Sequence, residues 1–227
     1  GVLMTKLHEC SKDLIMAEQK FGAFNYDPLP VVLTKGKDEW VWDVEGNKYF
    51  DCLSSYSALN FGHCNERITE VAIQQIKKLT LTGRAFYNDK LGEFFKEITA
   101  LTGMESALPM NTGAEAVETG IKLARRWGYR NKLIPKDCAE IIVCKDNFHG
   151  RTTTIVGFSS DEDTRSDFGP ATPGFKIIPF NDPDALLESI TKNTAAFLVE
   201  PVQGEAGIII PSEGYLKEIR KICTDLN

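Results

Sequence analysis

The sequence predicts an α/β protein whose sheet is mostly parallel and carries helices on both faces. Three runs of β-branched and apolar residues, at 140–144, 175–180 and 195–200, are typical of strands buried on both faces. A helical pattern at 184–190 separates the second run from the third, as a crossover between parallel strands requires. Upstream, alternating apolar residues on both sides of the turn at 45–47 predict an antiparallel hairpin.

The N-terminal residues predict a small antiparallel segment that follows a helix. Residues 1–20 have the pattern of an amphipathic helix. The segment 21–30 holds three aromatic residues and two prolines, so it is expected to be a loop. That loop either packs its aromatic side chains on the core or presents them to a ligand. Strands are expected at 31–34, 39–44 and 48–53, followed by a polar loop at 54–64.

The remainder predicts helices that alternate with strands. Asn65 is a suitable N-cap for a helix at 66–79, and Gly103 ends a second helix at 89–102. A short apolar run at 107–110 predicts a strand, and a final helix is expected from Tyr215 onward.

The composition excludes several classes of partner. The net charge is −6, and no basic run is longer than Arg125-Arg126, so neither nucleic acid nor an anionic membrane is expected to bind. No apolar run approaches the roughly 20 residues needed to cross a bilayer. We therefore expect a soluble protein with a small-molecule ligand.

The six cysteines form no C-x-x-C pair. This spacing favours free thiols in a reducing compartment over a disulfide framework. We expect the cytoplasm, or the mitochondrial matrix if a transit peptide was removed before Gly1. His63 and Cys64 are adjacent, and neighbours in a chain do not easily bind one ion, so no metal site is expected.

The helix that follows Thr112 has the residues of an anion-binding site. Thr112 and Glu115 form a capping box, in which the hydroxyl accepts from an amide and the carboxylate reaches back to the N–H of Thr112. Gly113 and Ala114 carry almost no side chain, so a phosphate could approach their amides at the positive end of the helix. The same residues also fit a capped helix that binds nothing.

Three loops follow predicted strands, at 111–116, 146–151 and 200–207. Ligands of parallel sheets bind at the C-terminal ends of the strands, which makes these loops the candidate site. Together, with FHGRT and VEPVQGEAG in this order, they resemble the class III aminotransferases, which use pyridoxal phosphate. The resemblance runs from about Phe21 to Asn227.

The resemblance implies pyridoxal-phosphate fold type I, as in aspartate aminotransferase. Residues 1–60 would then contribute to a small domain and the substrate entrance, and residues 61–227 would be the first part of the large cofactor-binding domain. Within the family, NYDPLPVV, SSYSALN, LTGRAFYN and NTGAEAVET are most similar to members that act on ornithine. Members that act on acetylornithine typically have NSGAEA and GEGG, so Thr112 and Ala206 favour ornithine.

The resemblance also assigns cofactor-binding residues. Thr112, Gly113 and Ala114 match the residues that hold the phosphate, in agreement with the argument from the helix start. Phe148 matches the aromatic residue that stacks on the pyridine ring, the alternative being a core position. His149, in the same motif, is a weaker candidate.

Substrate-binding residues follow in the same way. Arg151 and Tyr26 match the residues that bind the α-carboxylate and α-amino end of ornithine, which leaves the δ-amine facing the cofactor. Tyr56 matches an aromatic residue beside the substrate chain. Glu205 matches a carboxylate that pairs with a downstream arginine and switches the site between a diamine and a dicarboxylate. Glu200 is a weaker candidate that is equally consistent with a structural role.

No catalytic residue of the family is visible in the sequence. The Schiff-base lysine and the aspartate that pairs with the pyridine nitrogen lie in motifs (DExQTG, then a small-residue loop ending in lysine) that we expect after Asn227. Lys122 and Lys145 are expected to be surface charges. The chain alone is therefore expected to be inactive.

The expected reaction moves the δ-amino group of ornithine to 2-oxoglutarate and yields glutamate 5-semialdehyde and glutamate. The alternatives are an acetylornithine or 4-aminobutyrate aminotransferase, and a truncated module of this fold without turnover. A homodimer with shared active sites is expected, because family members assemble in this way and the loop at 21–30 is rich in aromatic residues.

Overall fold

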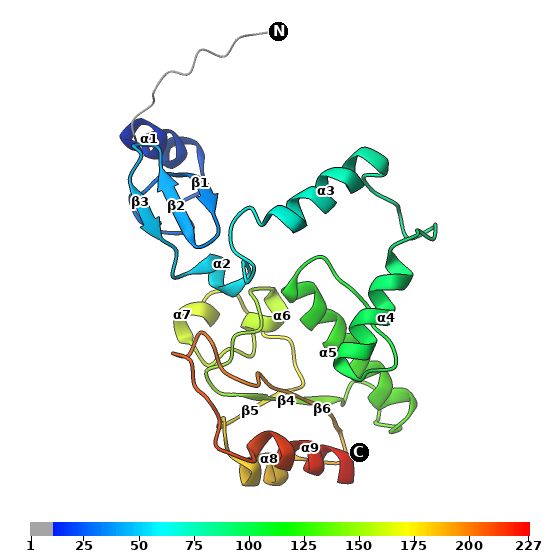
Figure 1. Ribbon diagram of the computed structural model, residues 1–227. Helices are drawn as coiled ribbons and strands as arrows, with labels where there is room; N and C mark the ends of the chain where they lie inside the picture. The colour runs from blue at the N-terminus through cyan, green and yellow to red at the C-terminus, as the bar shows by residue number, and fades with distance from the viewer. Residues whose placement is uncertain (1–10) are drawn as a thin grey trace. The chain divides into compact units, whose positions relative to one another are not determined.

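The computed structural model describes residues 11–227, drawn in Figure 1. The chain divides into two compact units, Gly1–Glu97 and Ile98–Asn227, and helix α4 (Leu91–Thr102) crosses the division. The domain boundary expected near residue 60 stays a prediction. The helix expected at 1–20 lies partly outside the described residues, and its described part is α1 (Ser11–Phe21).

The first unit contains the antiparallel sheet that the sequence predicts. Its strands lie in the order β1 (Leu33–Lys37), β2 (Trp40–Asp43) and β3 (Lys48–Phe50). The carboxylate of Asp43 fixes the β2–β3 turn by accepting hydrogen bonds from the backbone N–H groups of Glu45 (3.0 Å) and Asn47 (2.8 Å). The first strand begins at Leu33 rather than at residue 31, because its pairing with β2 starts there.

Two further helical segments follow in the first unit. Residues Ser54–Ser57, expected as loop, form the single turn α2, whose backbone is left-handed rather than right-handed. Helix α3 (Glu66–Lys78) begins as predicted, since Oδ1 of Asn65 accepts from the N–H groups of Arg67 and Ile68.

The second unit is built on a parallel sheet in the order β5-β4-β6. Strand β4 (Glu140–Cys144) is central, with β5 (Phe175–Ile178) and β6 (Thr194–Leu198) on either side. The side chains of β4 from Ile141 to Cys144 are almost fully buried, as its continuous apolar run predicts.

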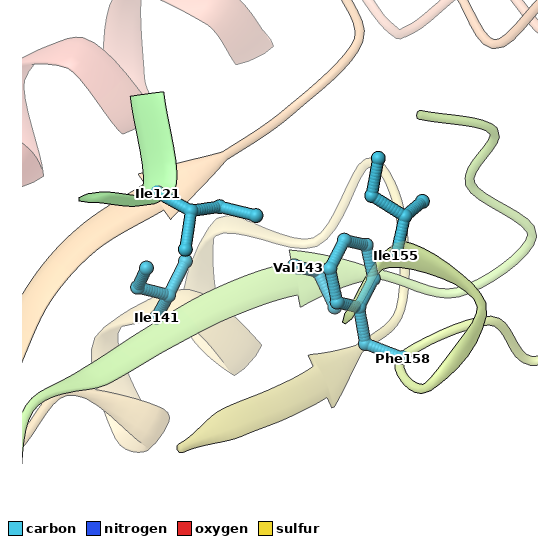
Figure 2. Close-up of a cluster of buried hydrophobic side chains, with 5 residues drawn as sticks. All are labelled: Ile121, Ile141, Val143, Ile155 and Phe158. Atoms are coloured by element: carbon cyan, nitrogen blue, oxygen red, sulfur yellow. The ribbon is translucent and has the colours of Figure 1, made fainter. Parts of the chain in front are cut away.

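Helices cover both faces of this sheet (Figure 1), as expected. Helix α5 (Gly113–Arg130) covers one face, where a buried cluster forms the core shown in Figure 2. That cluster consists of Ile121, Ile141, Val143, Ile155 and Phe158. Helices α8 (Pro183–Ser189) and α9 (Tyr215–Asp225) cover the other face, where Leu186, Tyr215 and Ile219 pack against Ile142 and Ile178.

The strand expected at 107–110 is not formed. The segment has no hydrogen-bonded strand neighbour among the described residues, and an apolar run becomes a strand only when a neighbour pairs with it. Two short helices, α6 (Thr153–Val156) and α7 (Glu162–Arg165), connect β4 to β5. Among residues 11–227, every helix is too short or too polar to cross a membrane.

Candidate functional site

The start of α5 presents free backbone donors. Oγ of Thr112 accepts a hydrogen bond from the N–H of Glu115 (3.1 Å), which caps the helix as predicted. The carboxylate of Glu115 accepts from the N–H of Asn111 (2.8 Å) and not from Thr112, so the second half of the predicted capping box is wrong by one residue. The N–H groups of Thr112, Gly113 and Ala114 have no acceptor among the described residues.

The space in front of these amides is open. A Cβ atom added at Gly113 would have no neighbour within 4 Å. Three unpaired N–H groups at the positive end of an 18-residue helix, with no side chain over them, suit the charge and size of a phosphate. The residues present therefore fit the phosphate end of pyridoxal phosphate.

The loop at 146–152 packs directly on this helix start. Gly150 has a φ of +126°, and a Cβ atom at that position would lie 3.0 Å from Cβ of Ala114. Two residues later, the hydroxyl of Thr152 donates to Oε1 of Glu118 (2.5 Å) and accepts from the N–H of Ile155 (3.2 Å). The loop is thus fixed to α5 by a close backbone approach and by a hydrogen bond.

Phe148 lies at the surface of this loop and is 41% exposed. Its backbone N–H donates to Oε2 of Glu200 (3.1 Å), so Glu200 links the loop at 146–151 to the end of β6. Burial raises the pKa of Glu200, opposed by the hydrogen bonds from the N–H groups of Phe148 and Gly204. The exposed ring of Phe148 is available to a flat ligand, and Glu200 holds the backbone of this residue.

His149 faces the core. Its ring centre lies 6.1 Å from that of the buried Phe158, and burial lowers its pKa. Its Nε2 atom is buried without a hydrogen-bond partner among the described residues. His149 also lines the cavity described next, so its part in binding stays a prediction.

Arg151 and Glu205 line one cavity of about 380 Å³, together with Phe148. The guanidinium carbon of Arg151 lies 5.9 Å from the centre of the Phe148 ring. Neither Arg151 nor Glu205 has a hydrogen-bond or ion-pair partner within residues 11–227. Two further carboxylates line the cavity, but Asp146 accepts from the hydroxyl of Ser160 and Asp161 from that of Thr164. The guanidinium of Arg151 and the carboxylate of Glu205 are left for a ligand that carries both charges, such as an amino acid.

The other two candidates, Tyr26 and Tyr56, belong to the first unit, where their hydroxyl groups hydrogen-bond to each other. Tyr56 lies in α2, where the residues from Ser54 to Ser57 have φ values of 48°, 50°, 55° and 68°. Each non-glycine residue in this left-handed region costs about 1–2 kcal/mol. Such strain persists only where surrounding contacts impose it, and it is concentrated at functional sites.

The sequence indicated most of these residues but missed the contacts that hold them. Gly150, Thr152 and Glu118 were not identified, because their contacts join residues far apart in the chain. Gln203 was also missed: it is 1% exposed, and its Nε2 donates to the backbone oxygen of Lys145 (2.7 Å). A glycine between polar residues in FHGRT was the one local sign of a close approach.

The fold is that of pyridoxal-phosphate enzymes of fold type I, with its α/β layers and the open start of α5. The chain belongs to the class III aminotransferases, whose family model matches residues 21–227. Aminotransferases of this class depend on pyridoxal phosphate. The chain is 60% identical to an ornithine aminotransferase of Brevibacillus brevis over 94% of its length, and 52% identical to that of Bacillus subtilis over 99%.

Solved structures agree with this assignment. The ornithine aminotransferase of Toxoplasma gondii aligns with 96% of the chain at a TM-score of 0.94 and 42% identity, and the chain covers 52% of it. The acetylornithine aminotransferase of Elizabethkingia anophelis aligns with 96% of the chain at a TM-score of 0.82 and 55% identity, with 53% of it covered. The chain likewise spans about half the length of the curated relatives that it matches, 54% for the Brevibacillus protein and 56% for the Bacillus protein.

Proposed function

We propose that this chain forms part of an ornithine δ-aminotransferase, which transfers the δ-amino group of ornithine to 2-oxoglutarate and yields glutamate 5-semialdehyde and glutamate. The observation that carries the proposal is the cavity beside Phe148, in which Arg151 and Glu205 remain unpaired. The names of the relatives at 52% and 60% identity support ornithine as the substrate.

The cofactor would be held from one compact unit. The amides of Thr112, Gly113 and Ala114 would donate to its phosphate, and the exposed ring of Phe148 would cover one face of its pyridine ring. When bound, pyridoxal phosphate supplies a conjugated, electron-withdrawing ring that accepts the electron pair left when a proton is removed from the substrate carbon. Glu200 keeps Phe148 in place through its backbone.

The substrate would be oriented by its far end. The guanidinium of Arg151 offers two parallel donors to the α-carboxylate, and the hydroxyl of Tyr26 binds at the same α-carboxylate and α-amino end. Tyr56 would lie beside the carbon chain. This arrangement leaves the δ-amine at the cofactor, and position alone selects which amine reacts. Glu205 would pair with an arginine outside residues 1–227 when the second substrate binds.

The lysine that binds the cofactor covalently and the aspartate for the pyridine nitrogen are proposed to lie outside residues 1–227. Lys122 and Lys145 are both exposed, Lys122 on α5 and Lys145 directly after β4. The chain by itself would then have no turnover. This part of the proposal is tested by assaying the 227-residue chain and the full-length protein side by side, with borohydride reduction to trap any lysine bound to the cofactor.

A homodimer is proposed as the assembly. Helix α3 exposes apolar side chains at Ile68, Val71 and Ile76, and Phe21 and Phe24 are exposed at the end of α1 and just after it. A second copy of the chain would cover such surface. Sedimentation of the full-length protein should show a dimer. A stable monomer that still transaminates would contradict this.

Arg151→Lys tests the substrate assignment, because an ammonium cannot form the paired hydrogen bonds of a guanidinium. We expect kcat/KM for ornithine in the full-length enzyme to fall at least about tenfold, which corresponds to about 1.4 kcal/mol. Arg126→Lys, on an exposed position of α5, is the matched control and should stay within about twofold. If Arg151→Lys also stays within twofold, the carboxylate is bound elsewhere.

Acetylornithine is the second candidate substrate, favoured by the 55% identity to the Elizabethkingia enzyme. A comparison of ornithine, N-acetylornithine and 4-aminobutyrate as amino donors decides between the candidates. Ornithine should have the highest kcat/KM. If the protein binds pyridoxal phosphate but turns over none of the three donors, the remaining candidate is a non-catalytic module of this fold.

A further inference from the structure

A carboxylate outside the assigned site fixes the entry to the strained turn α2. Oδ1 of Asp51 accepts hydrogen bonds from the backbone N–H groups of Leu53 (3.0 Å) and Ser54 (2.9 Å), and Ser54 is the first residue of the turn. Its other oxygen, Oδ2, lies 2.7 Å from Nε2 of His63. The Asp51 and His63 side chains are only 17% and 23% exposed. The hydrogen bond from Ser54, and then that from His63, lower the pKa of Asp51.

His63 is itself held rigidly in the first unit. Its backbone exchanges two hydrogen bonds with Asp38, at 2.8 and 2.7 Å. Its ring packs on Gly36 of β1, where a Cβ atom would lie 2.7 Å from the ring. The backbone N–H of Asp51 donates to the oxygen of Glu39 (2.9 Å), which ties Asp51 to the start of β2. Both partners are thus fixed to the antiparallel sheet, and the turn is fixed to them.

The turn needs this support. None of its residues, Ser54, Ser55, Tyr56 and Ser57, is a glycine or an asparagine, the residues that enter the left-handed region readily. Without Asp51, the N–H groups of Leu53 and Ser54 lose their acceptor and the backbone is free to relax. The Tyr56 ring, which leaves the chain in the middle of the turn, would move with it.

We propose that Asp51 and His63 are positioning residues that hold the left-handed turn and with it the Tyr56 ring, which the proposed function puts beside the substrate. The inference rests on the proposed function only in that Tyr56 lies beside the substrate. Asp51 acts through Tyr56 and does not touch the cofactor or the reacting atoms.

The test uses the full-length enzyme with 3-fluorotyrosine incorporated at position 56. Asp51→Ala should shift or broaden the fluorine resonance and lower kcat/KM for ornithine about tenfold, as a misplaced positioning group does. Affinity for pyridoxal phosphate, measured by absorbance, should stay within about twofold, because the proposed cofactor contacts belong to other residues. Glu66→Ala is the matched control, because it removes an exposed carboxylate of the same unit that pairs with Lys37 at 3.0 Å. It should change neither the fluorine resonance, nor kcat/KM for ornithine, nor the affinity for pyridoxal phosphate.

Two further variants separate a positioning role from a general loss of folded structure. Asp51→Asn keeps an oxygen that accepts from Leu53 and Ser54, so it should restore the resonance and most of the activity. In a Tyr56→Ala background, Asp51→Ala should lower kcat/KM by no more than about twofold, because its effect passes through the missing ring. Should Asp51→Ala fail to bind cofactor, His63→Ala replaces it, with His63→Gln as the variant that keeps a donor.

The outcomes are distinct. A wild-type resonance and wild-type ornithine kcat/KM in Asp51→Ala, while Tyr56→Ala is impaired, would overturn the positioning role and leave the proposed function intact. The positioning role would also be overturned if Asp51→Ala lowered kcat/KM equally in the wild-type and Tyr56→Ala backgrounds. Unchanged ornithine kcat/KM in Tyr56→Ala alone would instead remove Tyr56 from the substrate site, and with it the reason for positioning the ring.

Discussion

Gly150→Ala should separate the loop at 146–151 from the helix that it packs on. The added Cβ atom would lie 3.0 Å from Cβ of Ala114 and 3.1 Å from Cδ1 of Ile155, both closer than side-chain carbons normally approach. The residue would also have to keep a φ of +126°, a conformation that alanine rarely adopts. The loop must therefore move, or the strain must be stored.

The two costs can be added. A residue held in a sparsely populated backbone region costs about 1–3 kcal/mol, and one extra methyl group in a packed contact costs typically about 1–3 kcal/mol. We therefore expect the free energy of unfolding to fall by roughly 2–6 kcal/mol, with the lower end reached if the loop shifts. A shifted loop carries Phe148 and Arg151 with it, so cofactor affinity should fall as well.

Urea unfolding of the full-length protein measures the first effect, and an absorbance titration with pyridoxal phosphate measures the second. Gly120→Ala is the control, because Gly120 lies on α5 with nothing within 4 Å of an added Cβ. It should raise the free energy of unfolding by about 0.5–1 kcal/mol, as alanine for glycine does in a helix. A Gly150→Ala variant as stable as the wild type, with unchanged cofactor affinity, would refute the reasoning.

Three further predictions concern the same unit. Phe148→Ala should weaken pyridoxal phosphate binding by about 1 kcal/mol, or about fivefold in Kd, through loss of the aromatic stack, and equal Kd values in an absorbance titration would contradict this. Gly113→Ala should leave the urea midpoint unchanged or slightly higher, since its Cβ meets no protein atom, yet should raise the Kd for the cofactor; an unchanged Kd would place the phosphate elsewhere. Burial raises the pKa of Glu200, so the wild type should lose stability as pH increases from the ordinary value of 4.5 through the raised pKa. Glu200→Gln lacks this group and should therefore gain stability relative to the wild type over that pH range. Parallel curves of unfolding free energy against pH for the two proteins would count against this.

Local signals were enough for much of the second unit. The strands β4, β5 and β6 were predictable because their apolar runs are continuous, and the start of α5 because Thr112 is followed by small residues and Glu115. The segment at 107–110, Ala-Leu-Pro-Met, is also apolar, but its proline has no N–H to donate and it has no neighbour to pair with among the described residues. Strand formation is decided by partners distant in the chain, which a local pattern does not reveal.

The supporting contacts were hidden for the same reason. Thr152 and Glu118 are separated by 34 residues, and Glu200 reaches Phe148 across 52. The left-handed turn at Ser54–Ser57 has no residue that favours its backbone, and the contacts of Asp51 that support it do not show in a local pattern. The groups expected to meet a ligand stay a prediction from the sequence, and the structure shows the contacts that hold several of them.

The division of the chain into two units bears on how such an enzyme can diversify. The residues proposed for the cofactor, and Arg151 for the substrate, lie within Ile98–Asn227, whereas Tyr26 and Tyr56, also proposed for the substrate, lie within Gly1–Glu97. Mutations at 22–32 or 54–57 would thus change a segment proposed to contact the substrate without changing the amides proposed to hold the phosphate. The proposed function therefore assigns part of the amine-donor preference and the cofactor dependence to different parts of the sequence. A directed-evolution library confined to those two segments would sample new donors at little risk to cofactor retention.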